Sequence, residues 1–207
     1  MIAENTVLSF LEALGSQASA PGGGAGSAVA GALGSALLSM VCRLTIGKPE
    51  LEPVRPDMER IVAKTDVMTR RFLLLADEDA SAFSSVIEAY RLPKNSEAEI
   101  EARKAQIQAG YIKACEPPLA IARLCLEVLE LAPELAEKGN PAAVSDVGVA
   151  VRTALAGIEG AVLNVQINLK SIKDKAYVST TEAEVAVLVK QGREISDQVY
   201  ASVLAKL

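Results

Sequence analysis

The sequence predicts an all-α fold: a single-domain, up-and-down helical bundle with long helices that spans residues 1–207. Half of the 207 residues are hydrophobic, yet only 3% are aromatic and none is tryptophan. Alanine, valine and leucine supply much of this share, and they suit closely packed helices better than a sheet. Apolar positions recur with helical spacing, and glycine and proline divide them into long segments.

The first two predicted helices are separated by a glycine-rich loop. A short helix is expected at 6–14, ended by Gly15. The Pro-Gly-Gly-Gly loop at 21–24 then leads into a long helix that ends near Ile46. Small residues along this helix would let its neighbours approach closely; they are Ala28, Gly31, Ala32, Ser35 and Ser39.

The long second helix also raises the question of a membrane span. The stretch from Ala13 to Cys42 contains no charged residue. Because the proline-glycine loop interrupts it and Gly, Ala and Ser dominate it, we expect a buried central helix and no membrane association. The N-terminal residues do not resemble a signal peptide, so we expect a cytoplasmic protein.

A third helix is expected from Asp57 to Arg91, before Pro93. Its length is typical of a rod in a bundle. Core residues are predicted at helical spacing along it: Ile61, Met68, Phe72, Leu75, Ala82, Phe83, Val86 and Tyr90.

Capping signals and prolines divide the remaining half of the chain. Ser96 with Glu99 forms a capping box that is expected to begin a fourth helix, which continues through Cys115. The prolines at 117 and 118 are expected to end this helix and begin a fifth. Residues 139–141 (Gly-Asn-Pro) end the fifth.

Two more helices are predicted after this break. Ser145 or Asp146 is expected to cap a sixth helix that reaches about Lys173. A last amphipathic helix is expected at 180–207.

Composition excludes several classes of function. The net charge of −5, without a basic run interleaved with aromatic residues, makes nucleic acid an unexpected partner. The absence of histidine removes the commonest general base and metal ligand, so chemistry must use carboxylates, lysines, hydroxyls and amides. Three cysteines in apolar stretches, Cys42, Cys115 and Cys125, predict buried thiols in a reducing compartment.

Asp79 is the most informative polar residue. It continues the apolar stripe of the third helix between Leu75 and Phe83, whereas Asp77 points elsewhere. Spacing alone slightly favours a structural ion pair with Arg or Lys. The alternative is a carboxylate whose pKa is raised for proton transfer.

Three other features are candidate binding groups, each with a structural alternative. Free amides at the end of the loop 21–24 can bind an anion, although a tight turn is the commoner explanation. Asn164 and Asn168 lie one turn apart, beyond Gly160, and suit either a planar heterocycle or a contact between helices. Ser145 and Asp146 are expected to cap a helix, and a role in a binding site is the alternative.

Five ordered segments resemble the cyclodeaminase and cyclohydrolase family of folate enzymes, and together they span nearly the whole chain. They are APGGGAGSAVAGALGSALLSMVCRLTIGK (20–48), LADEDASAF (75–83), RLPK (91–94), GNPAAVSDVGVAV (139–151) and LNVQINL (163–169). The resemblance implies an all-helical homodimer with a folate cleft and a catalytic aspartate, which transfers to Asp79 or Asp77; burial favours Asp79. It also implies that the cleft is near Gly22, Gly23, Gly24, Ser27, Lys94, Asn140, Ser145, Asp146, Asn164 and Asn168.

The resemblance implies hydrolysis of 5,10-methenyltetrahydrofolate to 10-formyltetrahydrofolate, with no metal and no permanently bound cofactor. Asp79 would move the proton, Asn164 and Asn168 would hold the pterin or the adduct, and Lys94 would meet a folate carboxylate. One alternative is a cyclodeaminase that releases ammonia from formiminotetrahydrofolate; another is a non-catalytic folate-binding dimer. A formiminotransferase or a formyltetrahydrofolate ligase is the implied upstream or downstream partner.

Overall fold

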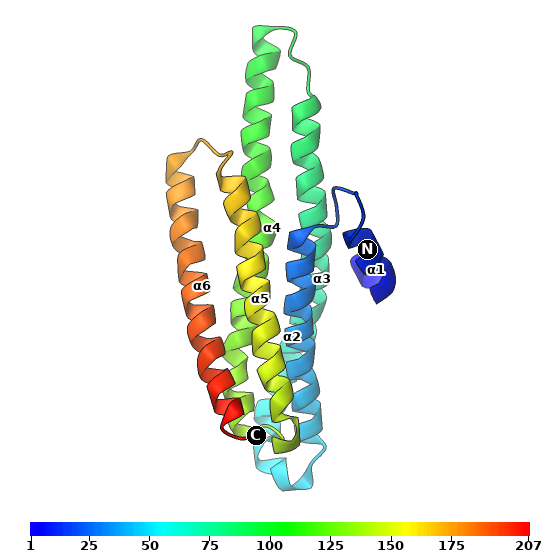
Figure 1. The fold of residues 1–207 in the computed structure, drawn as a ribbon, viewed down its shortest axis with the longest axis vertical. Coiled ribbons are helices and arrows are strands. Elements are labelled where there is room, and N and C mark those ends of the chain that lie inside the picture. Colours follow the sequence, from blue (N-terminus) through cyan, green and yellow to red (C-terminus); the bar gives the residue numbers. More distant parts are fainter.

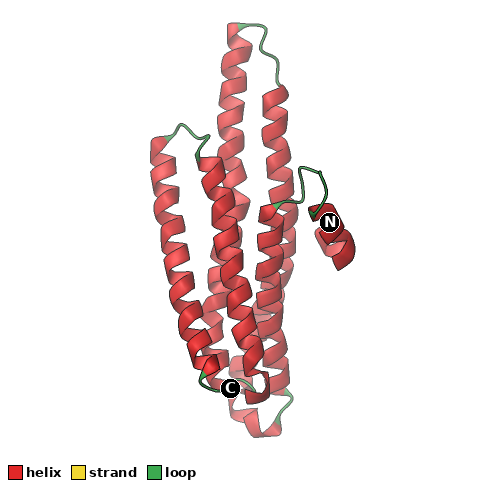
Figure 2. Cartoon of the chain, viewed as in Figure 1, coloured by secondary structure: helices red, strands yellow, loops and turns green.

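Five long helices run up and down beside one another, and a short helix lies against one side (Figure 1). The computed structural model describes residues 1–207 and contains no strand (Figure 2). The helices are α1 (Val7–Leu14), α2 (Gly23–Ile46), α3 (Arg55–Arg91), α4 (Glu97–Lys138), α5 (Val144–Leu169) and α6 (Lys175–Leu204). Short 3-10 turns occur at η1 (Ile2–Glu4), η2 (Pro49–Val54) and η3 (Pro141–Ala143). The predicted all-α, single-domain bundle is confirmed.

Side-chain caps explain where several helices begin. Thr6 Oγ1 accepts a hydrogen bond from the backbone N–H of Ser9, and Ser96 Oγ accepts one from Glu99. The last helix begins at Lys175, five residues before the predicted start, because Asp174 Oδ1 accepts hydrogen bonds from the N–H groups of Ala176 and Tyr177.

The prediction that Pro117 and Pro118 divide two helices is wrong, because α4 continues through both prolines. Pro118 has no N–H to donate to the carbonyl of Ala114, four residues earlier. Asn168 of α5 replaces that donor, with Nδ2 3.0 Å from the Ala114 oxygen. The backbone defect is therefore repaired by a neighbouring helix.

Neither Ser145 nor Asp146 caps α5, so this prediction is also wrong. The turn η3 leads directly into α5, whose N-cap position is Ala143 without a side-chain bond. The capping side chain belongs to Asn140, which accepts a hydrogen bond from the N–H of Ala142 at 3.0 Å.

Two predicted core residues of α3, Phe83 and Tyr90, are 43% and 48% exposed, contrary to expectation. Their spacing is correct for a core face, and the other predicted positions of this stripe are buried. The hairpin of α3 and α4 extends beyond the ends of α2 and α5 (Figure 1). We call residues 83–111 the arm; there, fewer helices surround α3 than in the bundle.

Small residues bring α2 close to its neighbours, as predicted, and Ala28, Gly31, Ala32, Ser35 and Ser39 are all buried. A Cβ atom on Gly31 would lie 2.5 Å from the Phe72 ring and 2.7 Å from the sulfur of Cys125. By length and composition α2 passes the test for a membrane span, which is weak evidence because half of the tested window is buried in the bundle. It packs against α3, α4 and α5.

Gly31→Ala is expected to lower the free energy of unfolding by about 1–3 kcal/mol, because the added methyl has no space against Phe72 and Cys125. Gly26→Ala is the matched control in the same helix, since no atom lies within 4 Å of its Cβ position. That control is expected to stabilise by about 0.5–1 kcal/mol through helix propensity. Urea unfolding of both variants measures the difference; equal effects would contradict the packing described here.

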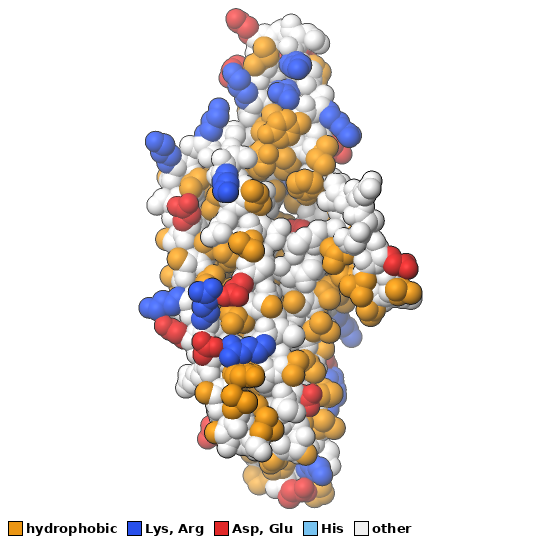
Figure 3. Space-filling view, viewed as in Figure 1, with side chains coloured by type: hydrophobic (Ala, Val, Ile, Leu, Met, Phe, Trp, Pro, Cys, Tyr) orange, Lys and Arg blue, Asp and Glu red, His pale blue; other side chains and the backbone are white.

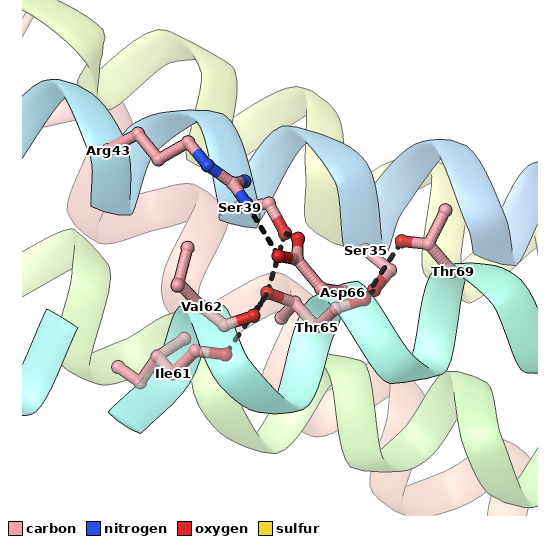
Figure 4. Close-up of polar contacts among 8 residues, drawn as sticks. All are labelled: Ser35, Ser39, Arg43, Ile61, Val62, Thr65, Asp66 and Thr69. Atoms are coloured by element: carbon pink, nitrogen blue, oxygen red, sulfur yellow. Dashed lines mark hydrogen bonds and ion pairs between the residues drawn. The ribbon is translucent and has the colours of Figure 1, made fainter. Parts of the chain in front are cut away.

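A polar seam stabilises the contact between the lower parts of α2 and α3 (Figure 4). Ser35 donates to the Thr65 carbonyl at 2.8 Å, and the Ser39 and Thr65 hydroxyls are 2.7 Å apart. Ser39 also donates to Asp66, which forms an ion pair with Arg43. The buried hydroxyls and the carboxylate of this seam are therefore all satisfied within the bundle.

Candidate active site

Asp79 lies in a pocket of about 220 Å³ near the start of α2. Figure 3 shows a hollow on this face, between α5 and the segment that precedes α2. Asp79 forms neither an ion pair nor a hydrogen bond, so the structural ion pair that spacing favoured is absent. The lining residues are Ser19, Ala20, Gly22, Gly23, Asp79, Ala80, Phe83, Ala114, Asn164, Ile167 and Asn168.

Burial without a partner raises the pKa of Asp79 from 3.8 to about 6. Asp66 on the same helix shows the opposite case. A hydrogen bond from the Arg43 guanidinium holds the pKa of Asp66 below its usual value. The pKa values of these two aspartates of α3 therefore shift in opposite directions, because Asp66 has a cationic partner and Asp79 is buried without one.

The first turn of α2 positions the Asp79 carboxylate. A Cβ atom on Gly24 would lie only 2.3 Å from Asp79 Oδ2, so the carboxylate lies directly against the backbone at Gly24. Gly22 is the N-cap and provides no side-chain cap. The N–H groups of Gly23, Gly24 and Ala25 have no acceptor four residues earlier, as at any helix start.

Asn164 and Asn168 of α5 also line the pocket, and their amide oxygens accept no hydrogen bond from the chain. Asn164 Nδ2 donates to the Gly160 carbonyl at 2.8 Å, and Asn168 Nδ2 donates to the Ala114 carbonyl at 3.0 Å. These bonds fix both amides, and neither Oδ1 atom accepts a hydrogen bond within the chain. The two amide oxygens are therefore available as acceptors for a ligand. Each amide also has a structural role, because its nitrogen donates to a backbone carbonyl.

Two predicted residues lie near the pocket without lining it. Ser27 is buried beneath it, where its hydroxyl donates to the Gly23 carbonyl at 2.8 Å and leaves room only for a glycine at 160. Asp77 points away, and its Oδ1 accepts a hydrogen bond from the N–H of Ile2 at 3.0 Å. The burial argument that separated Asp79 from Asp77 is consistent with this geometry.

Four other predicted residues are not brought to the pocket of their own chain. Lys94 is exposed in the turn between α3 and α4, four residues beyond Tyr90. Asn140 donates its N–H to Thr45 Oγ1 near the far end of α2, about 30 Å from Gly24 along the helix. Ser145 and Asp146 lie at the same far end, in the first turn of α5.

Sequence reasoning missed Phe83 as a pocket residue, because its spacing assigned it to the core. Its position one turn after Asp79 was the available signal. A larger groove of about 950 Å³ between α5 and α6 contains none of the predicted site residues. The structure contains no group of three or more His, Cys, Asp or Glu side chains that could hold a metal ion.

The three cysteines are buried and unpaired, as predicted. Burial raises the pKa of Cys42 to about 12 and that of Cys115 to about 11, and it also raises the pKa of Cys125. These thiols stay protonated near neutral pH, and none of them lines the pocket. Asp79 is the ionisable side chain of the pocket lining, and its pKa of about 6 is closer to neutral pH than that of an ordinary carboxyl.

The stability of the Asp79→Asn variant, relative to that of wild type, is expected to increase as the pH rises. Below pH 3.8 the carboxyl is protonated in both states. Between 3.8 and about 6 the folded wild type retains a proton that the unfolded chain has lost, so stability falls with rising pH. With allowance for solvent screening, the variant should gain roughly 1–2 kcal/mol on wild type between pH 3.5 and 7.5. Urea unfolding across this range measures the gap; a constant gap would contradict the raised pKa.

The bundle and its pocket define a class of all-α proteins in which an unpaired, half-buried carboxylate shares a pocket with two hydrogen-bonded amides. The family model for formiminotransferase-cyclodeaminase matches residues 6–187, and the chain belongs to this family.

Individual relatives show how far the similarity extends. A methenyltetrahydrofolate cyclohydrolase from Methylorubrum extorquens is 40% identical over 207 residues, covering 100% of both chains. The formimidoyltransferase-cyclodeaminase of Mus musculus is 32% identical over 98% of this chain, which corresponds to 38% of the mouse protein. A crystal structure of formiminotetrahydrofolate cyclodeaminase from Thermotoga maritima has a TM-score of 0.82 and 28% identity, covering 100% of this chain and 98% of that one.

Proposed function

We propose that this chain is a methenyltetrahydrofolate cyclohydrolase that interconverts 5,10-methenyltetrahydrofolate and 10-formyltetrahydrofolate. The observation that carries the proposal is the unpaired carboxylate of Asp79, with a pKa of about 6, in a pocket beside two amide oxygens. The full-length similarity to the Methylorubrum cyclohydrolase supports the choice of reaction.

Asp79 is assigned both proton transfers of the hydrolysis. As a carboxylate it balances the positive amidinium of the substrate and takes a proton from water as the oxygen bonds to the methenyl carbon. The protonated Asp79 then gives this proton to the N5 nitrogen as the carbon–N5 bond breaks. The hydroxyl proton of the adduct passes to solvent, which leaves the formyl group on N10.

The remaining walls fit the edges of a pterin ring. Its 2-amino, N3 and N8 groups carry N–H donors, which suit the free Oδ1 atoms of Asn164 and Asn168. Its 4-oxo group is an acceptor, which suits the free N–H groups at the start of α2. Donors and acceptors of the pocket are thus complementary to those of the ring.

Cyclodeaminase activity is the second candidate, supported by the name of the Thermotoga structure and by the mouse relative. In that reaction N10 attacks the formimino carbon and ammonia leaves, and Asp79 would carry the protons. Absorbance of methenyltetrahydrofolate separates the two functions. A cyclohydrolase is expected to remove methenyltetrahydrofolate faster than buffer alone does. Formation of methenyltetrahydrofolate from formiminotetrahydrofolate, with release of ammonia, would indicate a cyclodeaminase. Folate binding without either reaction would instead support the non-catalytic dimer.

We also propose that the protein works as a cytoplasmic homodimer. Large hydrophobic side chains are exposed on α2 and α5, two helices that pack against each other; they are Leu33, Met40, Leu44, Val149, Leu163 and Ile167. A second copy of this chain would cover such a face. If the two-fold axis of the dimer is perpendicular to this face, α5 of the two chains runs antiparallel. The N-terminal end of α5 in one chain then approaches the Asp79 pocket of the other.

Light scattering after gel filtration tests the dimer, with Leu33→Glu expected to give a monomer. A monomeric wild type would contradict it. Reduced, buried thiols support the cytoplasmic assignment, which fluorescence of a tagged protein in its own cell tests.

A further inference from the structure

The Asp79 pocket is too small for a whole folate. At about 220 Å³ it is below the range of pockets that enclose drug-sized ligands. Given the proposed function, on which this inference rests, the pocket takes the ring system that carries the reacting carbon. The aminobenzoyl ring and the glutamate must then lie outside it.

An exposed aromatic stripe begins at the edge of this pocket. Phe83 lines the pocket, and Asp79, Phe83 and Tyr90 share one face of α3 because they are four and seven residues apart. Helical rise places Phe83 about 6 Å and Tyr90 about 16 Å beyond Asp79. Both aromatic side chains lie on the arm, and Figure 3 shows hydrophobic side chains on the arm above the hollow.

The α4 side of the arm adds a second tyrosine and a positive charge. The rings of Tyr90 and Tyr111 meet edge to face, with centroids 6.3 Å apart and hydroxyls 3.2 Å apart. The Arg103 guanidinium lies 5.6 Å from the Tyr90 ring centroid. Its Nε and Nη2 donate to the Tyr90 carbonyl at 3.2 and 2.9 Å.

Arg103 is fixed by these contacts but not neutralised. It forms no ion pair with an acidic side chain, whereas neighbouring Lys104 is paired with Glu101 at 2.7 Å. Its Nη1 group makes no hydrogen bond in the chain. A planar guanidinium in this state suits a carboxylate.

We infer that the arm is the subsite for the aminobenzoylglutamate part of the folate. The aminobenzoyl ring packs on Phe83, and the glutamate extends along Tyr90 and Tyr111 until a carboxylate pairs with Arg103. This assigns to Arg103 the carboxylate contact that the family resemblance implied for Lys94. It also accounts for an aromatic stripe that the bundle leaves uncovered.

Arg103→Met tests this inference through KM. With methenyltetrahydrofolate, KM is expected to rise about tenfold with kcat unchanged, because one charge-assisted hydrogen-bond pair is lost. With an analogue in which a methyl group replaces the glutamate beyond the benzamide nitrogen, wild type and variant should have equal KM values. Lys104→Met is the matched control on the same turn and should leave both values unchanged.

Phe83→Leu separates ring stacking from glutamate binding. It removes the aromatic face but keeps an apolar side chain, so KM should rise for both substrates by a similar factor. Thermal melting confirms that each variant is folded.

The subsite is wrong if wild type turns over methenyltetrahydrofolate and Arg103→Met raises KM equally for both substrates, or for neither. It is also wrong if the variant changes only the oligomeric state, because the stripe would then be an interface. Absence of turnover in wild type would instead overturn the proposed function, so the two failures are distinguishable.

Discussion

Asp79→Asn is expected to lower kcat/KM for methenyltetrahydrofolate hydrolysis by about 10²–10⁴-fold, the usual range for loss of a general acid or base. The amide keeps the size of the side chain but neither takes a proton from water nor balances the positive amidinium. Initial loss of methenyl absorbance, corrected for the rate in buffer alone, measures the effect. Because the carboxylate is half-buried and unpaired, the variant should fold at least as stably as wild type near neutral pH.

Two neighbouring acids show whether this loss is specific. Glu78→Gln is the matched control, since Glu78 is exposed and paired with Arg71. Asp77→Asn should retain activity near the wild-type level, because that carboxylate binds the N–H of Ile2 outside the pocket. If Asp77→Asn removes turnover while Asp79→Asn keeps it, the assignment of the catalytic aspartate is wrong.

Gly24→Ala is expected to lower kcat/KM by roughly 10²-fold without unfolding the protein. The new methyl would lie within 2.4 Å of all three carboxyl atoms of Asp79, so the carboxylate must turn away from its position. Displacement of a reacting group by about 1 Å is enough for a loss of this size. The same assay measures it, and circular dichroism confirms that the helices are retained.

Gly26→Ala is the control for Gly24→Ala, because it adds the same methyl to the same helix in open space. A double variant gives the sharper test. If Gly24→Ala acts by moving the carboxylate, it should cause little further loss in the Asp79→Asn protein. Independent, multiplying losses would show that Gly24 acts by another route.

Local signals determined most of the helices. Gly47 after Ile46, the Ser96 cap and the Gly-Asn-Pro break at 139–141 act through backbone preferences of a few adjacent residues. The same applies to the stripe that distinguished Asp79 from Asp77, since helical periodicity is set within one element. These features could therefore be predicted from the chain alone.

Only the tertiary structure decided which polar and aromatic groups have partners. Pro118 does not end α4, because Asn168, fifty residues later, supplies the missing donor to Ala114. Asp79 remains unpaired because no basic side chain of another helix reaches it, while Arg43 reaches Asp66 on the same helix. Phe83 and Tyr90 have core spacing, but Phe83 lines the pocket at the ends of α2 and α5, and Tyr90 lies on the arm beyond them. Periodicity defines the face of a helix, but the lengths and placement of its neighbours determine whether that face becomes core, pocket or binding surface.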